Sequence, residues 1–333
     1  MPEPLDRPDR LDRLDPEGAV QAAAKRCSNW GRWGQDDRIG TLNFLDEAKR
    51  REGAGLVRRG ASFSLALPFD TKGPQNGWRR RTNPVHTMLD TGTDAERGLQ
   101  GFPHGLGGAD DVVFMPLQCS TQWDGLGHIF DHGKAWNGRP AGDVVTSEGD
   151  LVTGIETVAA LIAGRGVLLD VGRTLGEHGE LPDGFAVTTE HLTRTASEQG
   201  VAVGRGDLVL VRTGRLTRAR RDLAAGRGWN GYAQGPAPGL SFTTADWLHD
   251  SEIAGIATDT WGFEVRPNEF EVAFQPLHQV AIPNIGLFIG EMWDLDALAA
   301  DCAGDGVWEF FLTAAPIPVT GAVGAPVNPV AIK

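Results

Sequence analysis

Three segments in the middle of the chain decide the fold: "RGVLLDVG" (residues 165–172), "TTEHLTRTASEQG" (188–200) and "GDLVLVRTG" (206–214). The first and the third are short apolar runs, which is the pattern of buried strands. The second begins with a threonine that can cap a helix and ends at Gly200, a residue type that commonly terminates helices. Strand, helix and strand in this order predict an α/β sheet with helical crossovers.

The same alternation continues on both sides of these segments. We expect further strands at 62–69, 111–117, 253–260, 285–293 and 307–317, and further helices at 46–59, 155–164, 241–252 and 294–302. Residues 70–110 show no clear period, and a connection of this length is usually functional or mobile. These patterns predict one α/β domain with a mixed sheet over residues 28–333, preceded by a charged, mobile arm at residues 1–27.

The composition excludes several classes of partner. The net charge of −13 and the pI near 5.1 argue against nucleic acid, because binding to a phosphate backbone requires clustered lysine and arginine. We find neither an apolar run of membrane-spanning length nor a secretory leader, so we expect a cytoplasmic protein that makes no membrane contact. Cys27, Cys119 and Cys302 are widely spaced, which fits a reducing compartment, and we interpret Cys119 as a buried structural thiol.

Polar side chains are concentrated in "CSTQWDGLGH" (residues 119–128), directly after an apolar run. The glycines in this stretch disfavour a helix, so we predict a strand end followed by a loop. Asp124 and His128 lie four residues apart, and a carboxylate with a neutral imidazole is a ligand mixture that suits Zn or Mn. The alternative from spacing alone is that His128 is a core histidine and that Asp124 caps a turn.

The second half of the chain offers complementary groups. "PLHQV" supplies His278 and Gln279, and Glu291 follows an apolar strand, where a carboxylate is rarely left without a partner. The simpler interpretation of Glu291 is a salt bridge to an arginine. Asp259 comes just after another predicted strand, where open α/β sheets collect residues that bind ligands.

Residues 29–45, "NWGRWGQDDRIGTLNFL", contain too much glycine for a regular helix and are predicted to form a loop. Trp30 and Trp33 in this loop either fill part of the core or form an aromatic wall over a pocket. The two interpretations are compatible with each other.

Taken together, these residues resemble the metal-dependent cyclase-like hydrolases, the superfamily of kynurenine formamidase and isatin hydrolase. Members carry His-x-Gly-Thr-His-x-Asp-x-x-x-His after a strand, and residues 118–128 align with it. Thr121, Asp124 and His128 match, whereas Gln118 and Gln122 replace the two earlier histidines. The segments 29–45, 206–214, 239–248, 253–260 and 290–299 also look like this family, so the resemblance covers roughly residues 28–332.

The resemblance implies a swivelling β/β/α fold, a homodimer or homotetramer, and a divalent metal, Mn or Zn. By analogy, Asp124 is a metal ligand, His128 is the general base, and Glu291 binds metal or assists proton transfer. The site is completed by His278 or Gln279, with Gln118 and Gln122 in the positions of the lost histidines. Residues expected to contact the substrate are Trp30, Trp33, Thr121, Trp123 and Asp259.

The function implied is hydrolysis of an amide, lactam, ester or lactone bond of a small cyclic or acylated metabolite. A bound ion would polarise the carbonyl and lower the pKa of a water molecule, while His128 moves the proton. The two amides weaken this expectation, because a glutamine oxygen is a poorer zinc ligand than imidazole. The alternatives are that the metal is absent and the protein is a cyclase, dehydratase or isomerase, or that it binds a small molecule without catalysis.

Overall fold

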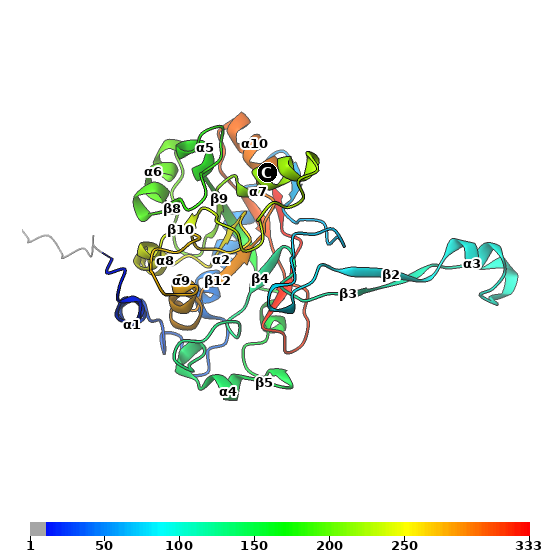
Figure 1. The fold of residues 1–333 in the computed structure, drawn as a ribbon, viewed down its shortest axis with the longest axis horizontal. Helices are drawn as coiled ribbons and strands as arrows, with labels where there is room; N and C mark the ends of the chain where they lie inside the picture. The colour runs from blue at the N-terminus through cyan, green and yellow to red at the C-terminus, as the bar shows by residue number, and fades with distance from the viewer. Residues whose placement is uncertain (1–10) are drawn as a thin grey trace, which may run out of the picture.

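The computed structural model describes residues 11–333, which form an α/β protein with one nine-stranded, strongly curled mixed sheet (Figure 1). The predicted α/β class and mixed sheet are confirmed. The four central strands are parallel, and the strands on both sides of them are antiparallel. In order across the sheet they are β1 (Ser62–Ser64), β15 (Val330–Ile332), β13 (Glu309–Thr313), β7 (Ala163–Asp170), β9 (Leu208–Arg212), β11 (Gly255–Thr258), β12 (Phe288–Glu291), β4 (Gln122–Asp124) and β14 (Gly324–Pro326).

Helices and small ribbons surround the sheet. The α-helices are α1 (Pro16–Arg26), α2 (Glu47–Ala54), α3 (Gly92–Glu96), α4 (Ala141–Val144), α5 (Val171–Leu175), α6 (Thr189–Gln199), α7 (Arg215–Ala224), α8 (Ala245–Asp250), α9 (Pro276–Val280) and α10 (Asp296–Asp305). The two-stranded ribbons pair β2 (Val85–Asp90) with β3 (Asp110–Phe114), β5 (Val145–Thr146) with β6 (Gly149–Asp150), and β8 (Ala186–Val187) with β10 (Gly239–Leu240). The short 3-10 segments include η1 (Gly40–Phe44) and η5 (Ile155–Val158), and the π-helical segment η7 (Ala281–Ile285) continues α9.

The central strands are mostly apolar, with charged residues towards their ends, because both faces of the sheet are covered. In β9, Leu208 and Leu210 belong to one core cluster, whereas Val209 and Val211 belong to another on the opposite face. Helix α6 begins at the predicted threonine cap, Thr188, and ends at Gly200 in the left-handed conformation, as expected. The helix and strand pattern of residues 165–214 therefore determines the middle of the sheet.

The N-terminal segment differs from the mobile arm that we predicted. Residues 16–26 form α1, which packs against α8 and α9 and buries Val20 and Ala23. Asp15 caps this helix by accepting a hydrogen bond from the backbone of Gly18. The prediction for residues 1–10 lies outside the described part of the chain.

Several predicted elements are corrected in extent or kind. The helix expected at 155–164 is only the single turn η5, because burying Ile155 and Val158, three residues apart, requires no more than one 3-10 turn. The helix expected at 46–59 ends at Ala54, and the strand expected at 62–69 ends at Ser64. Two further sheet strands, β14 and β15, follow the strand that we expected to be the last.

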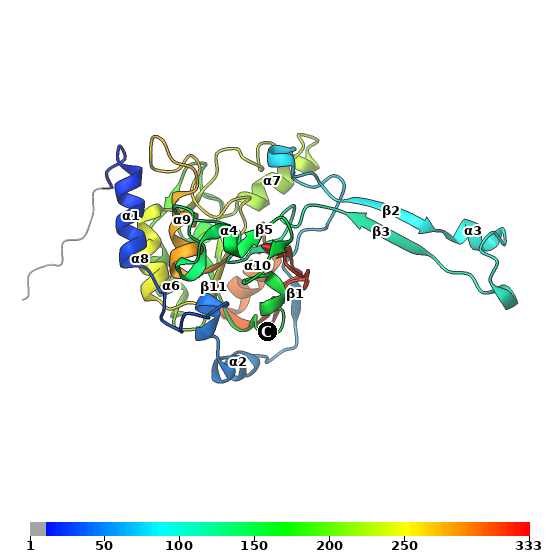
Figure 2. The same ribbon diagram turned by 90° about the horizontal axis from the view of Figure 1, so that it is seen from below.

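The largest departure concerns residues 70–114. The strand expected at 111–117 is β3, and it pairs with β2 rather than with the main sheet. Figures 1 and 2 show this hairpin projecting from the body, with α3 at its far end. We failed to predict β2 because six exposed residues leave no burial pattern in the sequence.

No helix within residues 11–333 has both the length and the apolar character needed to cross a membrane.

Candidate metal centre

Strand register places three polar side chains on one face of the sheet. β4 runs antiparallel to β12, with Gln122 opposite Glu291 and Asp124 opposite Ile289. Directly opposed residues in a pair of strands share a face, and so do residues two apart in one strand. Gln122, Asp124 and Glu291 therefore point to the same side, while Trp123 points into the core on the other side.

His278 approaches this face from α9. Its Nδ1 lies 2.6 Å from Oε1 of Glu264, and its Nε2 lies 3.2 Å from Oε1 of Glu291. Glu264 also accepts hydrogen bonds from the backbone N–H groups of Leu277 and His278, so it holds the start of α9 as well as the imidazole. A histidine that is oriented through Nδ1 by a carboxylate leaves Nε2 for a metal ion, which is a frequent arrangement in metal sites.

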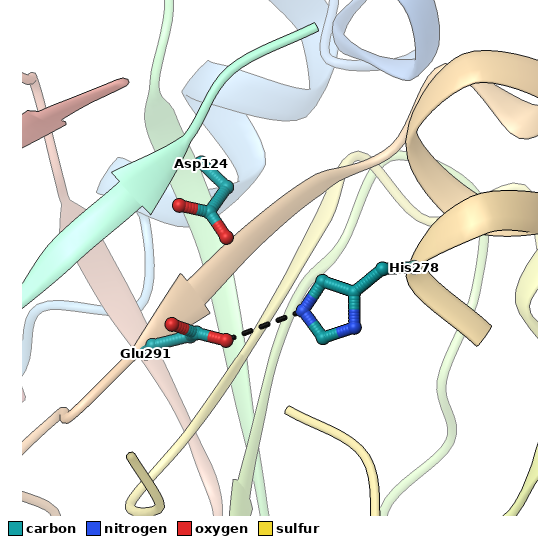
Figure 3. A group of neighbouring side chains, drawn as sticks. All are labelled: Asp124, His278 and Glu291. Carbon is teal, nitrogen blue, oxygen red and sulfur yellow. Dashed lines mark hydrogen bonds and ion pairs between the residues drawn. The ribbon is translucent and has the colours of Figure 1, made fainter. Parts of the chain in front are cut away.

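The three groups converge in a buried space (Figure 3). Asp124, His278 and Glu291 each offer one ligand atom, and these atoms lie within 4.8 Å of one another. Burial and the charge of Glu291 raise the pKa of Asp124 to about 8. Burial alone would lower the pKa of His278, but its hydrogen bonds to Glu264 and Glu291 outweigh that effect and raise the pKa to about 10.

Gln122 lies between the two carboxylates. Its Nε2 donates to Oδ1 of Asp124 at 3.1 Å and to Oε2 of Glu291 at 3.0 Å. Its Oε1 is buried and has no hydrogen-bond partner among residues 11–333, and the same holds for Nε2 of Gln118 and Oγ of Ser120. Buried polar atoms are nearly always paired in proteins, so the free Oε1 of Gln122, beside two carboxylates, is a candidate ligand atom.

The residues present fit a divalent cation. Two carboxylates and an imidazole provide three ligands, and the unpaired amide oxygen of Gln122 provides a fourth of the kind that hard cations accept. Cation binding requires the proton on His278 to leave and the amide of Gln122 to present its oxygen instead of its nitrogen.

His128 lies at the margin of the cluster. Its Nε2 is 3.8 Å from Oδ1 of Asp124, and its side chain keeps 17% exposure, against 1% for Asp124. Burial and the charge of Arg81 lower the pKa of His128 to about 3. The imidazole of His128 is therefore neutral at physiological pH.

The structure does not bring every predicted site residue to this cluster. Gln279 donates to Asp131 at 2.8 Å, so of the two alternatives only His278 reaches the carboxylates. Asp259 accepts three hydrogen bonds from Thr213 and Gly214, which hold the start of α7.

The aromatic and threonine residues expected at the substrate also have other partners. Trp30 donates to the carbonyl of Pro283, and Trp33 packs edge-on against Phe44. Trp123 donates to the carbonyl of Ala314 in the core. Thr121 bridges two chain segments, because its hydroxyl donates to Met292 and accepts from the backbone of Leu67.

Sequence reasoning missed Glu264, Phe263 and the loop before the hairpin. Phe263 packs edge-on against His278, with ring centres 5.8 Å apart, and its backbone N–H donates to Glu291. In the loop, Gln75 donates to the carbonyl of Cys119 and accepts from Trp261. The one available signal was "ATDTWGFE" (257–264), in which a second carboxylate follows the predicted strand.

Comparison with solved structures defines the class of the fold. Isatin hydrolase A from Labrenzia aggregata is 18% identical, with 84% of this chain and 94% of that chain covered and a TM-score of 0.57. The enzyme of the same name from Ralstonia solanacearum is 15% identical over the same shares, with a TM-score of 0.60. At these identities the likeness shows only that the fold is shared.

A closer match identifies the family. Residues 63–265 match the family described as "Putative cyclase". A crystal structure described as a novel cyclase is 38% identical, covers 93% of this chain and 99% of that chain, and has a TM-score of 0.84. The chain therefore belongs to this cyclase family. A search of the curated proteins finds no match.

Proposed function

We propose that this protein is a hydrolase that uses a divalent cation to cleave an amide, lactam, ester or lactone bond of a small cyclic or acylated substrate. The observation that carries the proposal is the buried convergence of Asp124, His278 and Glu291 beside unpaired polar atoms. The shared fold of structures named isatin hydrolases supports the same reaction class.

Each residue has a distinct part in this proposal. Asp124, Glu291 and Nε2 of His278 would hold the cation, and Glu264 fixes the orientation of His278. A cation held there would supply Lewis acidity to a substrate carbonyl and to water. His128, at the margin of the cluster, would accept the proton of the attacking water and deliver it to the leaving nitrogen or oxygen. In the net reaction, hydroxide adds to the acyl carbon and the leaving group gains the proton.

One observation favours a second candidate, a cyclase, dehydratase or isomerase that works without metal. Nε2 of Gln122 donates to both Asp124 and Glu291, which is the position between two carboxylates that a cation would otherwise take. In that case the amide neutralises part of the repulsion between the carboxylates, and the acid–base chemistry falls to Asp124 and His128.

Isotope incorporation separates the two candidates. Turnover of amide, lactam and ester substrates in water enriched in oxygen-18 should place one labelled oxygen in the acid product. The activity should disappear after chelation and return with Mn. Asp124→Asn should abolish turnover, whereas Asp131→Asn, which alters a buried carboxylate outside the cluster, should retain it. Activity that survives chelation and leaves no label in the product would contradict the hydrolase proposal and support the second candidate.

A further inference from the structure

A group of aromatic and cationic side chains lies beside the candidate metal centre and has no part in the proposed mechanism. Trp78 and Arg79 belong to the 3-10 segment η2 (Trp78–Arg80), whereas Trp261 and Arg266 belong to the loop that follows β11. The guanidinium of Arg79 lies 5.5 Å from the ring centre of Trp78, and that of Arg266 lies 5.2 Å from the ring centre of Trp261. The two indoles pack edge-on, with ring centres 5.5 Å apart. We call these four residues the arginine–tryptophan cluster.

Two hydrogen bonds connect this cluster to the segment that leads into β4. Nε1 of Trp261 donates to Oε1 of Gln75 at 3.3 Å, and Nε2 of Gln75 donates to the carbonyl of Cys119 at 2.7 Å. Burial and the charge of Arg81 lower the pKa of His128, so this arginine, next to η2 in the chain, also lies near the candidate site. The cluster and Arg81 therefore border the site.

A small open space separates the cluster from the carboxylates. Gly262 is buried, and a Cβ added to it would, apart from its two neighbours in the chain, come no closer than 3.9 Å to another residue. The nearest atoms are Cδ of Arg266 at 3.9 Å and Oε1 of Glu291 at 4.0 Å. Protein interiors are close-packed, so a buried glycine with room for a methyl group borders an unfilled space. This space lies between the inner arginine of the cluster and a candidate cation ligand.

Arg266 has no anionic partner. Its side chain makes one hydrogen bond within residues 11–333, to the carbonyl of Gln234, and no carboxylate in that range lies within ion-pair distance. Burial lowers the pKa of Arg266, and the charges of Glu291 and Glu264 raise it by less. A partly buried charge costs free energy unless an opposite charge compensates it, so an anion at this position would be stabilised.

The arginines at residues 79–81 also lack carboxylate partners. None of their side chains forms a hydrogen bond or an ion pair within the described part of the chain. By contrast, Arg212 pairs with Asp170 and Arg220 pairs with Asp294. Uncompensated positive charge is therefore gathered next to the candidate site, in a protein whose net charge is −13.

We propose that Arg266 and Arg81 bind a carboxylate that the substrate carries in addition to the bond that is cleaved. A planar part of the substrate occupies the space beside Gly262, and its carboxylate accepts hydrogen bonds from guanidinium groups, whose fork matches the two oxygens. The substrate class is thereby narrowed to anionic amides, lactams, esters or lactones. The inference rests on the proposed hydrolase function for the reaction, but binding of the anion requires neither a cation nor turnover.

Binding of two matched probes tests the anion site without catalysis. 4-Fluorobenzoate and 4-fluorobenzamide have nearly the same shape and differ in charge. Fluorine NMR of each probe with chelator-treated protein at neutral pH should show that the carboxylate binds about tenfold more tightly or better, because only the anion gains charge-assisted hydrogen bonds. Chelation removes any cation that could ligate the carboxylate itself.

Substitutions of the two arginines identify the residues that bind the anion. Arg266→Met keeps a long side chain without the charge and should lower the affinity for 4-fluorobenzoate about tenfold, with no change for 4-fluorobenzamide. Arg266→Lys should retain part of the affinity, since it keeps the charge and loses the fork. Arg81→Gln should also weaken binding of the carboxylate alone.

A control arginine and a steric variant complete the design. The Arg205 guanidinium lies 4.6 Å from the ring centre of Phe44 and pairs with Glu252, outside the cluster, so Arg205→Met should change neither affinity. Gly262→Val should weaken both probes by a similar factor, because it fills the space that either ring would occupy. Gly262→Ala adds a methyl group that fits, so it should unfold at the temperature of the wild type.

Turnover separates this inference from the proposed function. For an amide or ester substrate supplied as its carboxylate and as its neutral carboxamide, Arg266→Met should raise KM for the carboxylate about tenfold and change kcat little, because the lost contact is present in both the ground state and the transition state. Absence of all turnover would contradict the hydrolase proposal, while the probe affinities would still decide whether the anion site exists.

Three results would overturn the inference. These are equal affinities of the wild type for the two probes, an equal loss of affinity in Arg266→Met and Arg205→Met, and a preference for the carboxylate that arises only after Mn is added and persists in Arg266→Met. The last result would assign the carboxylate to the cation.

Discussion

At the scale of single residues, Gln122 is the most informative position of the site. It stands where the resembling family has a histidine, and its amide nitrogen contacts both carboxylates while its oxygen stays unpaired. An amide can take either orientation at little cost, so the same side chain can stabilise the empty cluster and ligate a cation. Gln122 therefore faces the ion position rather than the open side of the site.

Substitutions at residue 122 test whether the Gln122 side chain faces the cation. Gln122→His should raise the affinity for Zn by tenfold or more, because imidazole is the better zinc ligand. Gln122→Leu has a similar size but no donor or acceptor, and it should lower the affinity for Mn. Calorimetric titration of each variant with Zn and with Mn measures both effects. Equal affinities in all three proteins would place Gln122 outside the ligand set.

Glu264 is a positioning residue for His278. Glu264→Gln keeps the size of the side chain but weakens the hold on Nδ1, and it should lower cation affinity by roughly 10–100-fold. Calorimetric titration with Mn supplies the measurement. The change Glu269→Gln alters a carboxylate that bonds Ser241 and Phe242, away from the cluster, and should leave the affinity unchanged. A loss of affinity in both variants would indicate a general structural effect instead.

At the scale of elements, the close approach of α2 to the sheet depends on the absence of a side chain at one position of the helix. Gly53 is buried in α2, and a Cβ at this position would overlap the backbone of Gly164 and Arg165 in β7. Glycine weakens an isolated helix, so its presence here indicates that the approach of helix and strand requires it.

A pair of glycine substitutions in helices measures the packing of α2 against β7. Gly53→Ala should lower the free energy of unfolding by about 1–3 kcal/mol, because the strand must move to admit the methyl group. Gly142 lies in α4, and a Cβ added there would have no other atom within 4 Å, so Gly142→Ala should be neutral or stabilise by up to about 1 kcal/mol. Urea denaturation compares the two variants with the wild type. A neutral Gly53→Ala would show that α2 can move without cost.

The docking of α1 should depend on pH through His132. Hydrogen bonds to Asp131 and to Glu17 of α1 raise the pKa of His132 above its ordinary value. A raised pKa in the folded state stabilises the docked helix below the unfolded pKa of about 6.5 and loses that effect as the pH rises through the folded value. Between pH 6 and 9 the nearby Asp246, with a lowered pKa, and Cys27, with a pKa raised to about 12, keep their protonation states.

Hydrogen exchange of α1 measures this dependence. After correction for intrinsic exchange rates, amides of residues 16–26 should be better protected at pH 6 than at pH 9 in the wild type. In His132→Gln the protection should not change with pH. A wild type with equal protection at both pH values would remove His132 from the docking of α1.

The sequence predicts the elements that are buried on both faces and fails where burial gives no signal. β7, β9, β11 and β12 each contain a short apolar run, and their existence is confirmed. The strand β2 was not predicted because all its residues are exposed, and β3 was predicted as a strand but not as the partner of β2. An apolar spacing of three is shared by helices and 3-10 turns, so η5 was predicted as a longer helix.

For the candidate site, Asp124, His278 and Glu291 could be predicted because strand ends and a family resemblance indicated them. Glu264 could not be predicted, since its contact with His278 depends on how the loop between them folds back. Asp259, predicted to contact the substrate, accepts hydrogen bonds from the backbone of Thr213 and Gly214, because a carboxylate after a strand can also hold the start of a helix.

At the scale of the whole molecule, the curled sheet positions the candidate site. It brings β4 and β12 together beside α9, which creates one buried group of candidate cation ligands. The hairpin of β2 and β3 projects away from the body that holds this group (Figures 1 and 2).

The most direct test of the proposed cation site is anomalous diffraction from crystals grown with Mn. We expect one strong anomalous peak per chain, about 2.0–2.3 Å from oxygens of Asp124 and Glu291 and from Nε2 of His278. The peak should disappear in crystals of Asp124→Asn. Well-ordered crystals with no peak at this position, or with a peak only elsewhere on the protein, would contradict the assignment of these residues as cation ligands.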